Sequence, residues 1–237
     1  MLIKLGKQLG LLKYARFILA HNSWAYRIWL EVIISRYRSR EVLLKHIIEH
    51  SRNDSVIYDI GASAGLYSIV LGKLFPESAI YSFEPNPNAY AILLKNIKLT
   101  GLKNVFPLNF ALSSKNEMSD FHISSEAGRS SLHTYNAGYN SNITGTILVE
   151  CVTVDYLIKN NICKPPNIIK IDTEGHEYEI IRGASETIAK FHPAIGFEPH
   201  GIKDEIASTR DPIENFLVAQ GYIITSLGYP IWSQYAA

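Results

Sequence analysis

Side chains that can exchange protons or bind hydroxyl groups follow five short apolar segments of this 237-residue chain. In chain order they are Asp59, Glu84, Asn109, the group Asp172, Glu174 and His176, and the pair Glu198 and His200. Carboxylates and imidazoles serve as general acids and bases, and carboxylates also accept hydrogen bonds from hydroxyl groups. One such residue after an apolar segment is unremarkable, but five consecutive segments that end in this way predict a shared site.

A shared site requires that these segments be strands of one open sheet, because such sheets bind ligands at the carboxyl ends of their strands. From Val56 onward, short apolar runs alternate with longer amphipathic stretches. We predict strands over residues 56–60, 79–85, 104–113, 167–175, 194–201 and 222–227, and helices over residues 66–75, 88–101, 176–183 and 213–220. This alternation predicts an α/β fold with a mostly parallel sheet and helices on both faces.

Residues 115–150 interrupt the alternation. They are rich in Ser, Asn, Gly and Thr, and they carry strand-like patches at residues 118–123 and 147–152. We interpret them as an inserted antiparallel hairpin, and we expect the insertion to shape the pocket of the substrate.

The turn after the first predicted strand restricts the ligand. A phosphate-binding loop would place Lys after its last glycine, and a dinucleotide fingerprint would have glycine where this chain has Ser63 and Leu66. Gly61 and Gly65 still allow a ligand to approach the backbone, and the start of the following helix favours an anion such as an amino-acid carboxylate. The alternatives are a turn without a ligand and, for Asp59, a capping role.

Glu84 lies at the end of the second predicted strand, 25 residues after Asp59. An acid at this position can accept hydrogen bonds from both hydroxyls of a ribose, which predicts a nucleoside. The alternative is a solvated carboxylate in a turn.

A nucleoside joined to an amino-acid end describes S-adenosylmethionine, and the sequence resembles the FkbM family of class I methyltransferases. The resemblance spans about residues 55–225 and rests on VIYDIGASAGLYS (56–68), FEPNP (83–87), NFALSS (109–114) and IIKIDTEGHEYEIIRGA (168–184). It implies a Rossmann-like fold with a mostly parallel seven-stranded sheet, S-adenosylmethionine as cofactor, and O-methylation of hydroxyls on sugars, polyketides and related small molecules.

The resemblance also implies roles for the residues that match it. Asp59, Gly61 and Gly65 would line the methionine end of the cofactor, Glu84 would hold the ribose, and Asn109 would lie near the adenine or the ribose. Ala62 and Pro85 complete the predicted cofactor-binding set.

An alcohol acceptor must lose a proton as it is methylated, so we expect a general base within hydrogen-bond reach. We predict that Asp172 positions the acceptor or the sulfonium, that His176 or His200 is the base, and that Glu174 and Glu198 contact the acceptor. The alternatives are a helix-start role for Glu174 and ordinary solvated positions for both histidines. Asp172, Glu174 and Glu198 also offer oxygen ligands suited to Mg²⁺ or Ca²⁺, but their spacing is not fixed. We therefore expect no metal cofactor, with magnesium as the alternative.

The first 41 residues differ in charge from the rest of the chain. They contain eight Lys and Arg against two Glu, whereas the remainder contains 15 basic and 20 acidic residues. Apolar residues recur there at helical spacing, and the longest uncharged run, residues 17–26, is too short to span a bilayer. We predict a basic helical extension over residues 1–52 and a methyltransferase domain over residues 53–237. The extension would either cap the domain or lie on an anionic membrane surface, a partner or a second copy of the chain.

The net charge of +1 argues against a nucleic-acid-binding protein. Two cysteines cannot form a disulfide framework or a four-thiolate zinc site, which fits a reduced compartment. We expect a cytoplasmic enzyme, or one peripheral at the membrane, that acts on a glycan or small-molecule acceptor. The alternatives are a binding or scaffold protein that uses this fold without turnover, and a nucleotide-dependent oxidoreductase, which the missing glycines disfavour.

Overall fold

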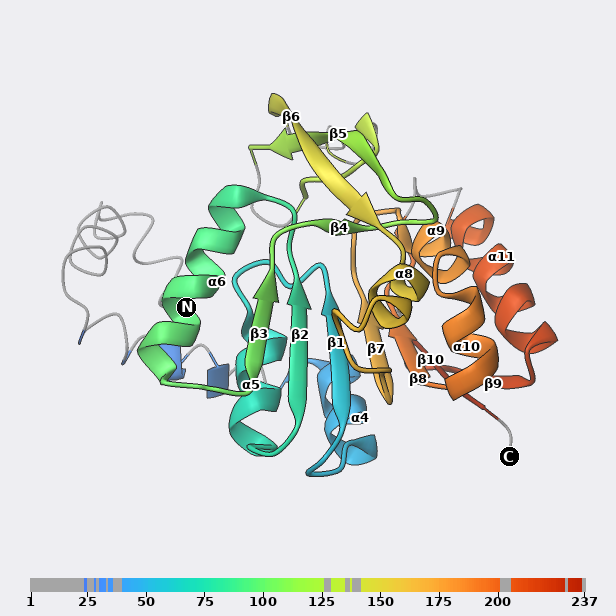
Figure 1. Ribbon diagram of the computed structural model, residues 1–237, viewed down its shortest axis with the longest axis horizontal. Helices are drawn as coiled ribbons and strands as arrows, with labels where there is room; N and C mark the ends of the chain where they lie inside the picture. Colours follow the sequence, from blue (N-terminus) through green and yellow to red (C-terminus); the bar gives the residue numbers. More distant parts are fainter. Residues whose placement is uncertain are drawn as a thin grey trace.

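The computed structural model describes residues 24, 28, 30–32, 34–35, 40–125, 129–134, 137, 142–200, 206–228 and 230–235. Its central feature is a seven-stranded sheet (Figure 1). In spatial order the strands are β3 (Val105–Leu108), β2 (Ala79–Phe83), β1 (Val56–Ile60), β7 (Ile168–Ile171), β8 (Ala194–Phe197), β10 (Ile231–Tyr235) and β9 (Tyr222–Ser226). The first five pair in parallel, whereas β10 runs antiparallel to β8 and β9. The predicted mostly parallel seven-stranded sheet is therefore confirmed.

Helices cover both faces of this sheet. One layer consists of α4 (Val42–His50), α5 (Leu66–Leu74) and α6 (Pro87–Thr100), and the other of α8 (Val154–Lys159), α9 (Glu177–Arg182), α10 (Ser185–Phe191) and α11 (Ile206–Ala219). Side chains alternate along β1: Ile57 packs with α4 and α5, while Tyr58 and Ile60 pack with the other layer. Strands that are buried on both faces are apolar along their whole length, which explains the runs that marked them in the sequence.

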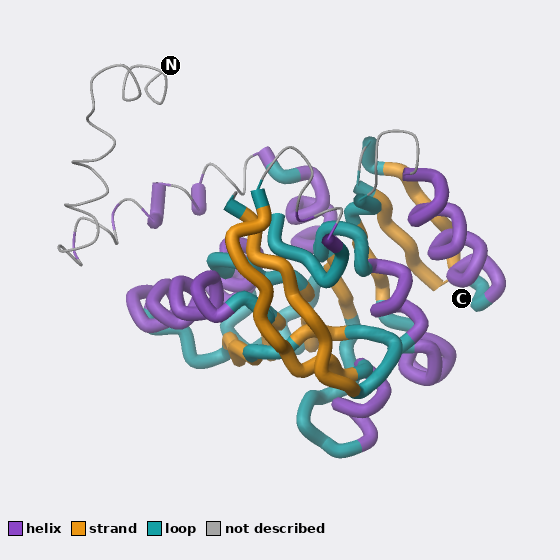
Figure 2. The backbone as a smooth tube through the Cα atoms, turned by 90° about the horizontal axis from the view of Figure 1, so that it is seen from above, coloured by secondary structure: helices purple, strands orange, loops and turns teal. Residues whose placement is uncertain are grey.

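A second sheet lies over the carboxyl ends of the main strands (Figures 1 and 2). Its strand β6 (Ile143–Val152) pairs antiparallel with β5 (Glu117–Ser124) and parallel with β4 (Ala111–Leu112). The predicted hairpin is confirmed, with residues such as Phe121 and Ile147 directly opposite each other. The predicted single strand over residues 104–113 is wrong, because the chain leaves the main sheet after Leu108 and joins the second sheet at Ala111.

Two other predictions of secondary structure need correction, and two short helices were not predicted. The strand predicted last, β9, is followed by β10, which inserts between β9 and β8. The helix predicted from Ile213 begins at Ile206, with Pro212 inside it. The short helices α8 and α10 gave no clear period in the sequence; α8 begins where the Thr153 hydroxyl accepts a hydrogen bond from the Tyr156 backbone at 3.0 Å.

Part of the predicted N-terminal extension packs on the main sheet. Leu43, Leu44 and Ile47 of α4 are fully buried, and the Leu43 side chain lies against Gly196 of β8. Leu30 is buried in the same core, as far as the described residues of this segment show. The boundary at residue 53 stays a prediction, as do the membrane and oligomer contacts of the extension, since residues 1–23 lie outside the described residues. Within the described ranges, no helix combines the length and the apolar character that crossing a membrane requires.

Candidate active site

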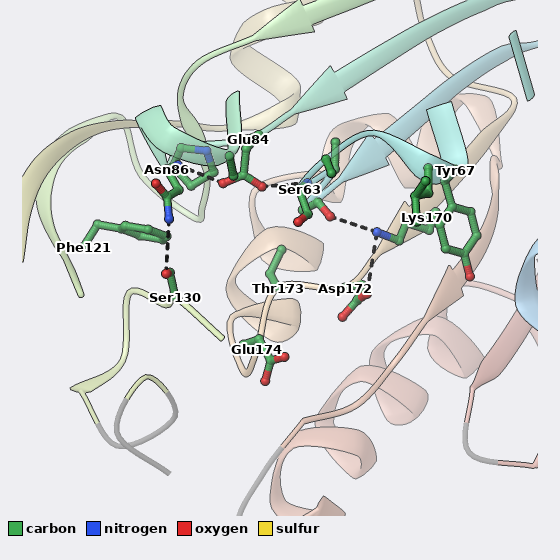
Figure 3. A pocket seen from close by; sticks show the side chains of 16 residues that line it. Ser63, Tyr67, Glu84, Asn86, Phe121, Ser130, Lys170, Asp172, Thr173 and Glu174 are labelled. Carbon is green, nitrogen blue, oxygen red and sulfur yellow. Dashed lines mark hydrogen bonds and ion pairs between the residues drawn. The ribbon is translucent and has the colours of Figure 1, made fainter. Parts of the chain in front are cut away.

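A cavity of about 280 Å³ lies at the carboxyl ends of β1, β2 and β7 (Figure 3). The turn after β1, the loop after β2 and the loop after β7 form most of its wall. The second sheet contributes Phe121, and the loop beyond β5 contributes Ser130, whose hydroxyl accepts a hydrogen bond from the Asn86 amide at 3.2 Å. The predicted insertion therefore closes one side of the cavity.

Two glycines shape the turn between β1 and α5. Gly61 and Gly65 have φ of +75° and +83°, a region that other residues rarely adopt. A Cβ at Gly61 would lie 1.9 Å from the Asp172 carbonyl oxygen, and one at Gly65 would lie 2.3 Å from the Leu93 side chain. Glycine at both positions lets the turn pass close to its neighbours. Gly61 and Ala62 line the cavity, whereas Gly65 lies outside its lining.

Glu84 presents a buried carboxylate at the cavity wall, with 6% of the residue exposed. One oxygen accepts a hydrogen bond from the Ser63 backbone at 2.7 Å, and the other accepts one from the Asn86 backbone at 2.8 Å. Burial raises the pKa of Glu84 to about 7, although both backbone N–H groups oppose this. Since each carboxylate oxygen has two lone pairs, each can accept one further hydrogen bond from a ligand.

Pro85 and Asn109 belong to the same corner. Pro85 lines the cavity, while Asn109 is exposed outside the lining and donates hydrogen bonds to the carbonyls of Glu84 at 2.8 Å and Pro85 at 3.2 Å. The structure thus brings Glu84, Pro85 and Asn109 together. Through these two hydrogen bonds, Asn109 holds the loop that carries Glu84.

Asp59 is fully buried beside the cavity and does not line it. Its carboxylate accepts hydrogen bonds from the backbone and hydroxyl of Ser68, and it forms an ion pair with Lys170 at 3.1 Å. Asp59 and Lys170 are register partners on β1 and β7, so their side chains project from the same face of the sheet. The predicted contact of Asp59 with the methionine end of a cofactor stays a prediction.

Lys170, which was not predicted from the sequence, lines the cavity and is 2% exposed. Its ammonium lies 3.8 Å from Asp172 and donates to the Gly61 carbonyl at 3.1 Å (Figure 3). It also lies 3.1 Å from Asp59 and donates to the Ile60 carbonyl at 3.3 Å. Burial alone would lower the pKa of Lys170, but the charges of Asp59 and Asp172 raise it above its usual value. A single lysine within an otherwise apolar strand, IIKI, was the signal that could have revealed it.

Asp172, Glu198 and His200 lie together at the ends of β7 and β8. The His200 Nε2 atom lies 3.7 Å from an Asp172 oxygen and 3.9 Å from a Glu174 oxygen, and its Nδ1 lies 3.3 Å from Glu177. Burial alone would lower the pKa of His200, but the hydrogen bond to Glu177 and the charges of Glu177, Asp172 and Glu174 raise it to about 9. Burial, followed by the charge of Asp172, raises the pKa of Glu198 to about 7. Asp172 and Glu174 line the cavity, and Glu198 and His200 stand beside it.

Glu177, also missed from the sequence, is a fully buried acid in the first turn of α9. Its Oε1 accepts backbone hydrogen bonds from Thr173 at 3.1 Å and Gly175 at 3.0 Å, so it holds the loop in which Glu174 has a φ of +55°. Although burial would raise the pKa of Glu177, His200 and these backbone groups lower it below its usual value. Its place three residues after Glu174, where a helix begins, indicated only an acid that favours a helix N-terminus.

His176 lies apart from the 280 Å³ cavity, beneath the second sheet. Its ring nitrogens contact His133 at 3.1 Å and the Ser113 hydroxyl at 2.9 Å. It lines a small apolar cavity of about 30 Å³ together with residues of both sheets such as Phe83 and Phe121. Burial, and then the charge of His133, lower the pKa of His176 to about 4. The two predicted bases therefore occupy different sites.

Several known proteins that resemble this chain are methyltransferases. A family model described as the methyltransferase FkbM domain matches residues 59–224. Hexuronic acid methyltransferase AglP of Haloferax volcanii is 25% identical over 173 residues, which cover 70% of this chain and 67% of that protein. The 2-O-methyltransferase NoeI of Sinorhizobium fredii is 26% identical over 148 residues, which cover 58% of this chain and 60% of that protein.

Solved structures support the fold. Methyltransferase FkbM from Methylobacillus flagellatus superposes with a TM-score of 0.51 at 14% identity, covering 79% of this chain and 45% of that chain. A precorrin-6y C5,15-methyltransferase from Geobacter metallireducens also gives 0.51 at 16% identity, covering 84% of this chain and 87% of that chain. At these identities the likeness concerns the fold alone.

Proposed function

The chain belongs to the FkbM family of methyltransferases, and from this membership and the geometry of the site we propose that it transfers the methyl group of S-adenosylmethionine to a hydroxyl of a saccharide or small metabolite. The observation that carries the proposal is the Glu84 carboxylate at the wall of the cavity. When bound, S-adenosylmethionine supplies a methyl group activated by its sulfonium.

The residues present fit this cofactor. Glu84 has an unused lone pair on each oxygen, which suits the two hydroxyls of a ribose. Gly61 and Ala62 line the cavity at the start of α5, where a helix N-terminus favours a carboxylate. The ammonium of Lys170 is paired with Asp59, so the wall of the cavity does not present an uncompensated cation to the sulfonium.

The carboxylates that follow β7 and β8 are the groups that we propose to bind the methyl acceptor. Asp172 and Glu174 line the cavity, and ionised carboxylates accept hydrogen bonds from hydroxyls. The names of two relatives, a hexuronic acid methyltransferase and a 2-O-methyltransferase, support a sugar hydroxyl as the acceptor. We propose that Asp172 orients this hydroxyl and that Glu174 and Glu198 contact the rest of the acceptor.

The two histidines differ in how well their positions suit the role of general base. His200 lies 3.7 Å from Asp172, next to the cavity, whereas both ring nitrogens of His176 already have partners away from it. His200 is therefore the better placed of the two proposed catalytic histidines. Because the pKa of His200 is about 9, its ring is protonated at neutral pH and would first have to lose that proton to act as a base.

Calorimetry with S-adenosylmethionine tests the cofactor assignment. Glu84→Ala removes two charge-assisted hydrogen bonds, so the binding free energy should weaken by roughly 3 kcal/mol, about 100-fold in Kd. Glu84→Gln keeps an acceptor oxygen for the backbone and guards against local unfolding. Glu77→Ala, an exposed acid at the opposite end of β2, is the matched control and should bind normally. Unchanged binding in both Glu84 variants would refute the assignment, and a wild type that binds no cofactor would support the binding-protein alternative.

A panel of acceptors that offer a hydroxyl, a nitrogen or a carbon atom for methylation tests the reaction. Release of S-adenosylhomocysteine should depend on a neutral sugar, a hexuronic acid or a glycan chain in the panel. Methylation confined to a nitrogen or carbon acceptor would contradict the proposed O-methylation while leaving the methyltransferase activity in place.

A further inference from the structure

Three side chains of a kind that binds metal ions converge at the ends of β7 and β8. Asp172, Glu198 and His200 each offer a ligand atom, and these atoms all lie within 4.8 Å of one another. Ligands sit roughly 2.0–2.3 Å from a divalent cation, so two ligands of one ion are at most about 4.5 Å apart. Adjustments of a few tenths of an ångström would therefore bring the three groups around one ion.

His200 is oriented as metal-binding histidines are. Its Nδ1 faces the Glu177 carboxylate at 3.3 Å, and that side chain is completely buried. A histidine whose Nδ1–H donates to a carboxylate keeps Nε2 as the ligand atom, and such an outer carboxylate is a recurring feature of metal sites. Nε2 points toward Asp172, 3.7 Å away. Glu177 thus fixes the ring in the orientation that a metal would require.

The charges around His200 favour a cation. Asp172, Glu174 and Glu177 all lie within 4 Å of its ring nitrogens, and the charge of Glu198 also acts on it. In addition, Glu177 Oε2 is buried and has no hydrogen-bond partner among the described residues. Lys170 approaches Asp172 through one oxygen at 3.8 Å, while the other oxygen faces His200. Among the described residues, Arg129 also acts on Glu174, but Lys170 is paired more closely with Asp59, so the carboxylates of this cluster outnumber the cations near them.

We propose that Asp172, Glu198 and His200 bind one divalent transition-metal ion of the Mn²⁺ type beside the cavity. Two carboxylates and one imidazole suit Mn²⁺ better than Mg²⁺, which seldom takes a nitrogen ligand. Three protein ligands leave coordination positions open, and Asp172 belongs both to this cluster and to the cavity wall. The oxygen ligands considered from the sequence were Asp172, Glu174 and Glu198. In the structure His200, not Glu174, lies with the other two.

An ion at this position would explain how an acceptor hydroxyl becomes reactive. A hydroxyl oxygen that takes an open coordination position becomes more acidic and releases its proton to water more readily. This part of the inference rests on the proposed function, because it assumes that a hydroxyl is methylated. The ion would replace the proton on His200, since the ring must be neutral to serve as a ligand. With the ion bound, His200 and Glu198 would act as ligands, in place of the base and acceptor-contact roles proposed for them above.

Mn²⁺ binding to the full-length chain tests the site without any reaction. After treatment with EDTA and its removal, calorimetry and electron paramagnetic resonance should detect one Mn²⁺ per chain. His200→Gln and Glu198→Gln should each raise the Kd by about 100-fold or more, and Glu177→Gln by about 10–100-fold. His122→Gln and Glu150→Gln, on the second sheet and away from the cluster, are the matched controls and should bind as the wild type does.

Pulsed electron paramagnetic resonance adds a signature that loose binding to acidic groups would lack. Coupling of the Mn²⁺ electron spin to an imidazole nitrogen should be present in the wild type and absent in His200→Gln. Thermal unfolding of each variant shows whether a loss of binding comes from a loss of fold. No Mn²⁺ binding by the folded wild type, or equal affinity in folded His200→Gln and Glu198→Gln, would overturn the proposal.

Different outcomes would refute the metal site and the proposed reaction. Methyl transfer that persists at full rate in EDTA, with no Mn²⁺ bound, would overturn the metal site and leave the methyltransferase proposal intact. Mn²⁺ bound through His200 in a chain that methylates no hydroxyl acceptor would support the site and refute O-methylation.

Discussion

His176 and His200 each follow a strand of the parallel sheet, yet their surroundings drive their charges in opposite directions. His176 lies under the second sheet between His133 and Ser113, and burial and the charge of His133 lower its pKa to about 4. His200 lies among carboxylates, where burial alone would lower its pKa, but Glu177, Asp172 and Glu174 raise it to about 9. At neutral pH the first ring is neutral and the second is a cation.

The difference shows that burial alone does not decide the charge of a histidine. Both rings are mostly buried, and burial opposes the protonated form of both. A buried carboxylate within hydrogen-bond distance reverses the outcome for His200, whereas His176 has a second imidazole in that place. The two histidine regions, that of His176 under the second sheet and that of His200 at the ends of β7 and β8, are therefore separable by variants that act on one of them.

The largest expected effect on stability comes from removing the Glu177 carboxylate, which the His200 region has and the His176 region lacks. Glu177→Gln removes the closest counter-charge of His200 and weakens the hydrogen bonds from the Thr173 and Gly175 backbones, so the free energy of unfolding should fall by about 4 kcal/mol at pH 7. Glu179→Gln is the matched control, since this acid lies two residues later, is about one-third exposed, and should cost less than about 1 kcal/mol. Urea unfolding measures both. Equal losses in the two variants would mean that Glu177 does not stabilise the His200 region.

The pH dependence of His176 is the next largest effect. Because its pKa falls from 6.5 to about 4 on folding, the unfolded chain takes up a proton first as the pH drops below 6.5. The wild type should therefore lose about 3 kcal/mol of stability between pH 6.5 and pH 4 that His176→Gln does not lose. The difference between the two proteins, measured by urea unfolding at several pH values, removes the contribution of other groups. Parallel curves would show that His176 titrates normally.

His200 should show the opposite dependence. Its pKa rises from 6.5 to about 9 on folding, so its stabilising effect is complete below pH 6.5 and is lost as the pH rises through 9. Since its side chain is 18% exposed, we expect about 2 kcal/mol of this loss in the wild type and none in His200→Gln. The measurement is made in EDTA, so that a bound metal does not compete with the proton. A stability that rises with pH in the wild type relative to the variant would reverse the assignment of the two regions.

Much of the fold was predictable because the strands are buried on both faces. The runs at residues 56–60 and 79–83, and the helix that ends at Gly101, appeared in the sequence nearly as they stand in the structure. The sharing of one rim by Glu84, Asp172, Glu198 and His200 followed from the rule that parallel strands end on one side. The order of the strands did not, because the antiparallel insertion of β10 depends on pairing between distant segments.

The roles of buried ionisable groups were beyond the reach of the sequence. In the sequence, Lys170 is a single charge within an apolar strand, and Glu177 is one of several acids at the start of a helix. Their importance comes from partners far along the chain, Asp59 for the lysine and His200 for the glutamate. Similarly, the contact between His176 and His133 depends on how the loop beyond β5 folds back beneath the second sheet.

The smallest expected effect concerns the partner that keeps His176 neutral. His133→Gln removes the imidazole that lies 3.1 Å from the His176 ring and lowers its pKa, and it leaves the bond between His176 and Ser113. The pKa of His176 should therefore rise while burial still holds it below 6.5. His133 is exposed, so the free energy of unfolding at pH 7 should change by less than about 1 kcal/mol. NMR titration of the His176 ring protons measures the pKa directly, and His122→Gln on the neighbouring strand serves as the control. If the pKa of His176 stays near 4 in His133→Gln, burial alone accounts for it. In that case the contrast with His200 comes entirely from the carboxylates around His200.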